Sequence, residues 1–450
     1  MRAPHLTPAP RRALALALAA LLAPAAWALD LQQAYDAALA NDASIRASRA
    51  GAQAQHERLP QARSQFYPNI SLNAGRNFNN LTSKSTNLLG QPVESRQDYF
   101  SGNQALQLRQ PLYRPAMLAQ LRQAQAQVES ADADLARDEQ SLVVRVGEAY
   151  FEALLTRDQL ALVLAQKQTY STQVDAAKKT LAAGSGTRTD VDDAQARLDM
   201  TVAQELEARQ NEDFTRRRLE TLTGSDVDTL ARLDEERFTP QPPQPEAVSD
   251  WVARAEAASP ELQSLRAQAE AARQEIAKAR SGHLPTLDAV AQWSRTSSDS
   301  VTSVNQRYDN KTIGLQLQVP LYSGGYVSSS VRQAQAALTR AEEMLEATRR
   351  DLGVRVHREF RGVTEGRLRI AALQQAVRSA EQAVQSSRKS QAAGVRTLLD
   401  VLNAEQQRTQ AQRDLAQARY LYLVSQLRLH SLVGDDAQAS VAQANAALLH

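Results

Sequence analysis

Residues suited to ion pairing gather just after two glycine-containing turns of the chain. Asp190 follows the first turn, and Arg396 and Asp400 follow the second. An arginine–aspartate pair is directional and can hold two helices together, although a partly exposed pair is worth only about 1 kcal/mol or less. A small sum of such bonds suits a contact that has to open.

The same residues also suit a simpler role. Hydroxyl and charged residues at helix starts usually cap the helix, and Thr187 with Asp190 fits that pattern. We interpret Arg396 with Asp190 as a latch between helices in preference to a cap, and both roles remain open at this point.

Groups that would support catalysis lack the spacing that catalysis requires. The histidines at positions 56, 283, 357 and 430 show no metal-ligand spacing, and none lies near a paired carboxylate in sequence. Gly184-Ser-Gly186-Thr187 resembles a phosphate loop but lacks the lysine and the preceding strand, so it is better interpreted as a helix reversal. We therefore expect no enzyme, no metal and no cofactor.

A duplicated frame positions both turns. Leu121-Arg-Gln-Ala-Gln-Ala126 returns as Val331-Arg-Gln-Ala-Gln-Ala336 after 210 residues, and the two turns are separated by the same distance. A long fixed period has to be recognised before a fold is assigned. We predict two structural repeats, 29–238 and 246–434, joined by a Pro-rich linker, 239–245, and followed by a poorly fixed C-terminal tail, 435–450.

The N-terminus has the composition of an export signal. Arg2, Arg11 and Arg12 precede an apolar stretch, and Ala26-Trp27-Ala28 fits a cleavage site, so residues 1–28 are predicted to be a signal peptide. Without it, 49 basic and 50 acidic residues remain, and nothing suggests binding to nucleic acid. The chain has no cysteine, which excludes disulfides and an N-terminal lipid anchor.

Each repeat is predicted to contain a helix, a β-hairpin, a long helix and a further helix. The first helices, 31–64 and 246–281, and the long helices, 115–182 and 327–392, are rich in strong helix formers. A helix of about 65 residues would be roughly 100 Å long, which exceeds a compact domain and indicates a coiled coil or a helical barrel.

Four segments change to a period of two. The clearest contains Ile313, Leu315 and Leu317 alternating with polar residues, within hairpins predicted at 66–113 and 284–322 and closed by polar loops, 79–98 and 295–307. Aromatic residues near the strand ends are typical of membrane barrel strands, whereas a soluble sheet packed on one face is the alternative. Since no apolar run is long enough for a transmembrane helix, entry into a membrane would require a closed barrel.

Four strands cannot close a barrel, so the membrane interpretation requires an oligomer. Two copies would give eight strands, whose interior side chains fill, whereas three copies would give twelve strands and leave a lumen. The strand count therefore favours three copies for a conduit, without excluding other numbers.

The motifs resemble the TolC family of outer-membrane channels over essentially the whole mature chain. They are the opening Leu31…Ala34-Tyr35, the strand ends Pro111-Leu-Tyr113 and Pro320-Leu-Tyr322, the two Ala-Gly…Asp-Val…Ala turns and the paired Leu-x-Gly endings. Ala149-Tyr150-Phe151 and Ala418-Arg419-Tyr420 are similar to the type I secretion and multidrug branch.

The resemblance implies an α+β membrane protein that forms a homotrimer. A twelve-stranded β-barrel would contact outer-membrane lipid and continue into a periplasmic α-helical barrel. The protein would be a passive exit duct of an efflux pump or a type I secretion system. A periplasmic adaptor protein and an inner-membrane transporter would open it and supply energy. Drug efflux and protein secretion would use the same residues, so the cargo stays open.

The resemblance also implies a gate at the periplasmic end, closed by hydrogen bonds, salt bridges and rings of aspartate. Two positions depart from the family: Gln391 replaces a tyrosine and Asn403 replaces a second aspartate, for which Asp193 would compensate. Three copies of Asp400 on one axis would repel each other and attract cations. The predicted gate comprises Thr189, Asp190, Asp193, Arg396, Asp400 and Asn403.

A soluble periplasmic coiled-coil adaptor or a structural protein is the alternative function. Adaptors share the helical hairpin but lack two amphipathic β-hairpins with aromatic ends. Recovery in a detergent-free periplasmic fraction would favour this alternative.

Overall fold

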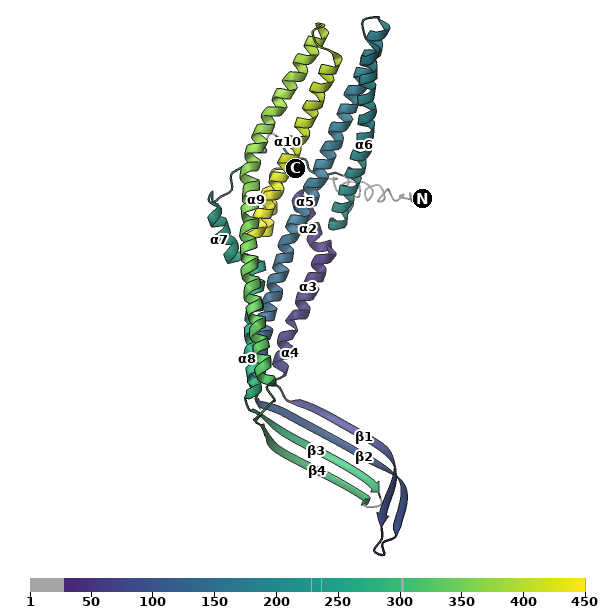
Figure 1. The fold of residues 1–450 in the computed structure, drawn as a ribbon, viewed down its shortest axis with the longest axis vertical. Coiled ribbons are helices and arrows are strands. Elements are labelled where there is room, and N and C mark those ends of the chain that lie inside the picture. Colours follow the sequence, from purple (N-terminus) through teal and green to yellow (C-terminus); the bar gives the residue numbers. More distant parts are fainter. Residues whose placement is uncertain (1–27, 228, 236, 301–302, 450) are drawn as a thin grey trace, which may run out of the picture. The chain divides into compact units, whose positions relative to one another are not determined.

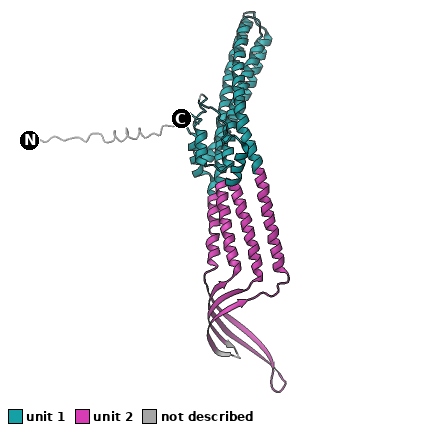
Figure 2. Ribbon diagram, turned by 90° about the vertical axis from the view of Figure 1, so that its left-hand side faces the viewer, with its two compact units in different colours: residues 1–46, 138–259, 352–450 teal, residues 47–137, 260–351 magenta. Residues whose placement is uncertain are grey.

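The structure is a computed structural model that describes residues 28–227, 229–235, 237–300 and 303–449. The predicted signal peptide lies outside the described residues except for position 28. The chain folds into two compact units, residues 1–46, 138–259 and 352–450 in unit 1 and residues 47–137 and 260–351 in unit 2 (Figure 2). Each unit therefore combines parts of both predicted repeats.

Long helical hairpins dominate unit 1 (Figure 1). Helix α5 and helix α9 contain 68 and 67 residues, as their alanine-rich sequences predicted, and both extend into unit 2. Each reverses at a glycine with positive φ, Gly184 at 76° and Gly394 at 75°, a conformation that glycine adopts without steric cost. The helices of this unit are α2 (Leu31–Asn41), α5 (Pro115–Ala182), α6 (Arg188–Thr223), α7 (Val248–Ala258), α9 (Tyr326–Ala392), α10 (Leu398–Leu432) and α11 (Ala437–Asn445).

The first helix of each repeat is interrupted, so the predicted continuous helices 31–64 and 246–281 are wrong. Asp42 has an extended backbone and accepts a hydrogen bond from the Ile45 amide at 3.0 Å, which starts a new helix. Ser259 is likewise extended because Pro260 disfavours a helical residue before it. The resulting pieces are α2, α3 (Ala43–His56) and α4 (Arg58–Ser64) in the first repeat, and α7, α8 (Pro260–Arg280) and the 3₁₀ turn η1 (Ser281–His283) in the second.

Unit 2 contains a four-stranded antiparallel sheet in the order β1-β2-β3-β4. The predicted polar loops are wrong in length, because the strands continue through most of 79–98 and 295–307. In the first hairpin, the Asn87 side chain accepts hydrogen bonds from the amides of Leu89 and Gln91, both at 3.0 Å, which closes a short turn. The strands are β1 (Asn69–Thr86), β2 (Pro92–Tyr113), β3 (Thr286–Ser300) and β4 (Ser303–Gln318).

No helix in the described part of the chain combines the length and the apolar character needed to cross a membrane.

The C-terminal segment is ordered by packing, so the prediction of a poorly fixed tail is wrong. Helix α11 buries Val441 and Ala444, each 2% exposed, and the following Leu448 bridges to Leu233. The Asn445 side chain accepts a hydrogen bond from the Leu31 amide at 3.0 Å, which joins the two ends of the described chain.

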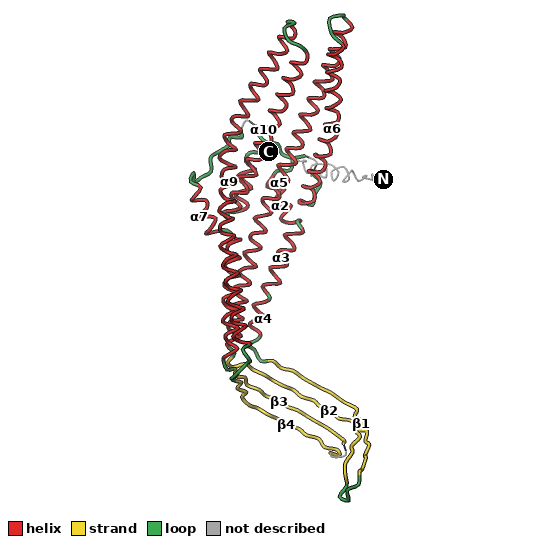
Figure 3. The backbone as a smooth tube through the Cα atoms, in the orientation of Figure 1, coloured by secondary structure: helices red, strands yellow, loops and turns green. Residues whose placement is uncertain are grey.

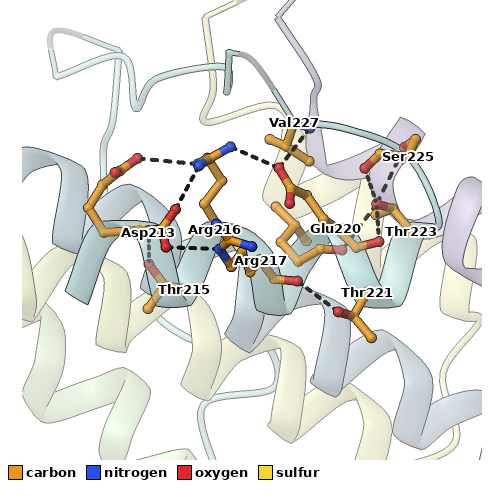
Figure 4. A network of polar contacts seen from close by, with 11 residues as sticks. Asp213, Thr215, Arg216, Arg217, Glu220, Thr221, Thr223, Ser225 and Val227 are labelled. Atoms are coloured by element: carbon orange, nitrogen blue, oxygen red, sulfur yellow. Dashed lines mark hydrogen bonds and ion pairs between the residues drawn. The ribbon is translucent and has the colours of Figure 1, made fainter. Parts of the chain in front are cut away.

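Charged side chains also fix the end of α6 (Figure 4). Arg216 donates to Asp213 at 2.8 Å and to Glu220 at 3.0 Å, and Glu220 accepts from the Val227 amide at 3.4 Å. Arg217 donates to the second Asp213 oxygen at 2.8 Å. The network holds the chain as it leaves the helix towards the strand-like segment around Leu230.

A half-buried carboxyl group, that of Asp158, lines a cavity of about 440 Å³ between α5, α9 and α10. Tyr420 donates a hydrogen bond to Asp158 at 2.6 Å. Burial raises the pKa of Asp158, an effect that this hydrogen bond and the charges of Arg157 and Arg232 partly offset.

This environment predicts a pH-dependent effect of Asp158→Asn. Because the folded-state pKa is raised, the folded protein disfavours the ionised carboxylate, and wild-type stability falls as the pH rises through that pKa. Asparagine still accepts the Tyr420 hydrogen bond but carries no charge. We expect the variant to gain thermal stability over wild type at pH 8 and to gain less, or lose some, at pH 4, as measured by circular dichroism. An equal difference at both values would contradict the prediction.

Candidate functional site

The predicted gate residues lie in unit 1, in or just after the turns that join α5 to α6 and α9 to α10. Figure 3 shows these turns as the tips of two helical hairpins. The tips share one turn geometry. In the first turn, the amide of Gly184 donates to the Leu181 carbonyl at 2.9 Å, and in the second, Gly394 donates to Gln391 at 2.9 Å. Gln391, which stands where the family has a tyrosine, therefore contributes its backbone carbonyl to the end of α9. Any residue type could play this role.

An apolar cluster connects the two hairpins close to their tips. Its buried members come from α5, α6 and α10, so one hairpin packs on the other through α10. Burial of such side chains stabilises the contact by about 25 cal/mol per Å² of apolar surface. The cluster consists of Tyr170, Val174, Ala177, Ala194, Leu398 and Leu402, with Val191 and Leu198 partly buried against it.

Both aspartates that begin the second helices form capping boxes. The Thr187 hydroxyl donates to Asp190 Oδ2 at 2.6 Å, and the Asp190 amide returns a bond to Thr187 at 3.2 Å. Thr397 and Asp400 repeat this geometry at 2.8 Å and 3.2 Å. The capping alternative is therefore confirmed for Asp190, although these bonds involve only Oδ2 of each carboxylate.

The second aspartate is held in its charged form. Hydrogen bonds from the Thr397 hydroxyl and amide lower the pKa of Asp400, and the nearby charge of Arg396 contributes in the same direction. Asp400 is also exposed. An exposed, firmly ionised carboxylate at a hairpin tip can attract cations or accept a hydrogen bond from another chain.

Arg396 makes its intramolecular contact within its own hairpin. Its Nη1 donates to the Ser387 hydroxyl at 2.7 Å, and Ser387 is fully buried. Among the described residues of this single chain, no hydrogen bond or ion pair joins Arg396 to Asp190. A latch would therefore have to form between copies, and it stays a prediction.

The remaining gate residues lie on α6 and α10. Thr189 is exposed and Asp193 is partly buried at the start of α6, while Asn403 is exposed on α10. Asn403 has a partner that sequence reasoning missed, because Arg197 donates to its side-chain oxygen at 2.6 Å and to Gln406 at 2.9 Å. Arg197 lies two helical turns after Asp190, which places both on one helix face. That spacing was the signal that could have revealed it.

Each hairpin is held together by one buried glutamate, which the sequence analysis did not identify. Glu205 accepts from Lys167 of the facing helix at 2.6 Å. Glu405 is 1% exposed and is paired with Arg388 of the facing helix and with Arg408 at 2.8 Å. Removing one partner of such a pair leaves a buried charge uncompensated, which is strongly destabilising.

Histidines and carboxylates are the candidate metal ligands among the described residues. In the portion of the chain that the structure covers, no three such residues lie in an arrangement that could hold a metal ion.

Paired long helical hairpins and an amphipathic four-stranded sheet place the chain in a class of outer-membrane channels. The family model for outer membrane efflux proteins matches residues 34–225 and 251–435. The chain therefore belongs to the outer membrane efflux protein family, and the resemblance to TolC-type channels is confirmed.

Individual relatives agree with this assignment. The chain is 36% identical to the alkaline protease secretion protein AprF of Pseudomonas aeruginosa over 431 residues, which covers 94% of this chain and 89% of AprF. It is 33% identical to the outer membrane protein TolC of Vibrio cholerae over 432 residues, which covers 95% of each chain. The solved structure of the Vibrio cholerae outer membrane protein VceC matches with a TM-score of 0.75 at 21% identity, covering 90% of this chain and 96% of VceC.

The protein is thus a channel of the outer membrane that extends into the periplasm and serves efflux or secretion. The relatives are channels, not enzymes, in line with the expectation from the histidine spacing. The alternative of a soluble periplasmic adaptor does not fit, because the chain belongs to a family of outer-membrane proteins.

Proposed function

We propose that three copies of the chain form the conducting tube. The sheet ends in two strands, β1 and β4, that each have one neighbour in the single chain. Unpaired strand edges are not tolerated in lipid, so β4 of one copy would pair with β1 of the next. Three copies would close twelve strands around a lumen, and their helical hairpins would form a helical barrel.

We further propose that the tube is the exit duct of a type I secretion system with a protein cargo. The similarity to AprF, a protein named for alkaline protease secretion, carries this proposal. An adaptor and an inner-membrane transporter would engage the hairpin tips, where Arg396 and Asp190 of neighbouring copies would form the latch. Efflux of small molecules is the second candidate, because the family model describes efflux proteins.

Complementation would test the cargo. A strain that keeps a protease transporter and its adaptor but lacks the outer-membrane channel should regain extracellular protease activity when this chain is expressed. The vector alone is the control, and minimum inhibitory concentrations of drugs are measured in parallel. Restored drug resistance without protease in the medium would contradict the secretion proposal and favour efflux.

A further inference from the structure

Most cations of the sheet lie on an unexpected face. Strand pairing places Arg76 and Arg307 in one row across the four strands, with Gly102 and Ser297 between them. Directly paired residues share a face, and the rows of that face recur every second residue. The next two rows on the same face contain Arg295 with Asp309 and then Lys311 with Trp293. We call Arg76, Arg295, Arg307 and Lys311 the basic rows.

This face is the apolar side of the sheet. Closer to the helices of unit 2, it carries Ile70, Ile313, Leu315 and Leu317, which are 64%, 89%, 70% and 64% exposed. Such exposure suits strands that meet lipid. On the opposite face, the rows that contain residues 73, 75 and 77 carry only uncharged side chains across all four strands. In these rows the cations are therefore confined to the apolar face, where charge is most costly, whereas Arg109, closer to the helices, lies on the opposite face and pairs with Asp288 there.

Aromatic rings accompany the basic rows. The Arg76 guanidinium lies 4.9 Å from the centre of the Phe100 ring, which packs on Phe78 at 5.3 Å. The Arg295 guanidinium lies 5.7 Å from the Trp293 ring. Aromatic girdles of membrane barrels mark the boundary with water, where a charge on the lipid-facing side costs little. The basic rows therefore belong at the level of the lipid headgroups.

Carboxylates within these rows do not balance their positive charge. Asp309 is their one carboxylate, and it accepts hydrogen bonds from Trp293 at 2.9 Å and Arg295 at 3.1 Å. Arg76, Arg307 and Lys311 remain as an excess of positive charge.

Charge is balanced again farther from the helices. In β1 and β2, beyond Phe78 and Phe100, the same face carries two acidic and two basic residues, Asp98, Arg96, Glu94 and Lys84. The excess is thus restricted to the aromatic level.

We propose that the basic rows bind the phosphate groups of anionic lipids in the outward-facing leaflet. The choice of face rests on the proposed barrel, whose apolar side meets lipid. A guanidinium group can donate two parallel hydrogen bonds to the oxygens of one phosphate, and a lysine ammonium adds a compact positive charge. The rows begin at the middle of β3 and β4 and continue towards the turn between them, away from α4 and α5, so the outer leaflet supplies the lipid. Phosphate-bearing glycolipid is the class that fits.

Lipid retention tests the proposal. The wild-type oligomer, the triple variant Arg76→Gln/Arg307→Gln/Lys311→Gln and the control Arg96→Gln would be placed in nanodiscs that contain a bisphosphorylated glycolipid or its dephosphorylated form. Bound lipid is counted by native mass spectrometry. Each basic residue near a charged lipid surface contributes roughly fivefold in affinity, so the triple variant should lose the preference for phosphate while Arg96→Gln keeps it. A triple variant with the wild-type preference would overturn the proposal.

Two further arms separate the explanations. Inorganic phosphate should not displace the glycolipid, and full displacement would mean a site for free anions, which overturns the lipid assignment. If the triple variant does not assemble, Lys311→Gln alone should lower the preference about fivefold, and an unchanged preference would count against the proposal. Failure of wild type to restore protease secretion would reject the exit-duct proposal and leave this lipid result standing.

Discussion

Replacing Arg396 by serine should raise the conductance of the channel in planar bilayers. The latch proposed between Arg396 and Asp190 of a neighbouring copy is a partly exposed ion pair, so each of the three latches is worth about 1 kcal/mol or less. Loss of about 1 kcal/mol shifts the balance between open and closed states roughly fivefold, and three copies lose their latches together. We therefore expect the mean conductance to rise about fivefold or more.

Three companion variants make the result specific. Arg188→Ser removes an arginine near the other turn whose side chain is 88% exposed and only 3.9 Å from Asp192, and it should leave conductance unchanged. Ser387→Ala removes the intramolecular partner of Arg396 and should also have little effect. Arg396→Lys keeps the charge but loses the guanidinium geometry, and it should give an intermediate value. Wild-type conductance in Arg396→Ser would rule out the latch.

Local patterns were sufficient for the long helices and their reversals. Alanine-rich stretches without proline predicted α5 and α9. A glycine indicated where each of these helices ends, because the turn that follows needs a residue with positive φ. The strands were located by alternation but were predicted too short. Polar residues in 79–98 show no alternation, yet the partner strand supplies backbone hydrogen bonds whatever the side chains are.

Contacts between distant residues explain most of what the sequence left open. Helix α11 is ordered because Asn445 meets Leu31, 414 residues away. Arg197 meets Asn403 across 206 residues, so neither partner indicates the other in sequence. The gate residues were located at the hairpin tips, but a pair between copies depends on an interface that one chain does not contain.

Trp251→Ala should cause the largest loss of stability in unit 1. Trp251 is 1% exposed and donates from its ring nitrogen to the Pro245 carbonyl at 2.8 Å, which fixes the linker to α7. His430 packs edge-on against the ring at 5.4 Å, and the Arg254 guanidinium lies 4.8 Å from its centre. Truncating a buried tryptophan costs about 3–5 kcal/mol, because packing is lost and a cavity remains.

The neighbouring polar contacts would not compensate for the loss. Arg254 and His430 both contact Asp435, at 2.6 Å and 2.7 Å. These contacts do not involve the Trp251 ring, so they would not fill the cavity that its removal leaves. Arg254→Ala should cost only about 1 kcal/mol, the value of a partly exposed cation–π contact and ion pair. Trp293→Ala in the sheet should leave the helical transition unchanged. Thermal melting followed by circular dichroism at 222 nm would measure all three, and similar melting temperatures for Trp251→Ala and Arg254→Ala would show that the buried ring is not the main stabilising element.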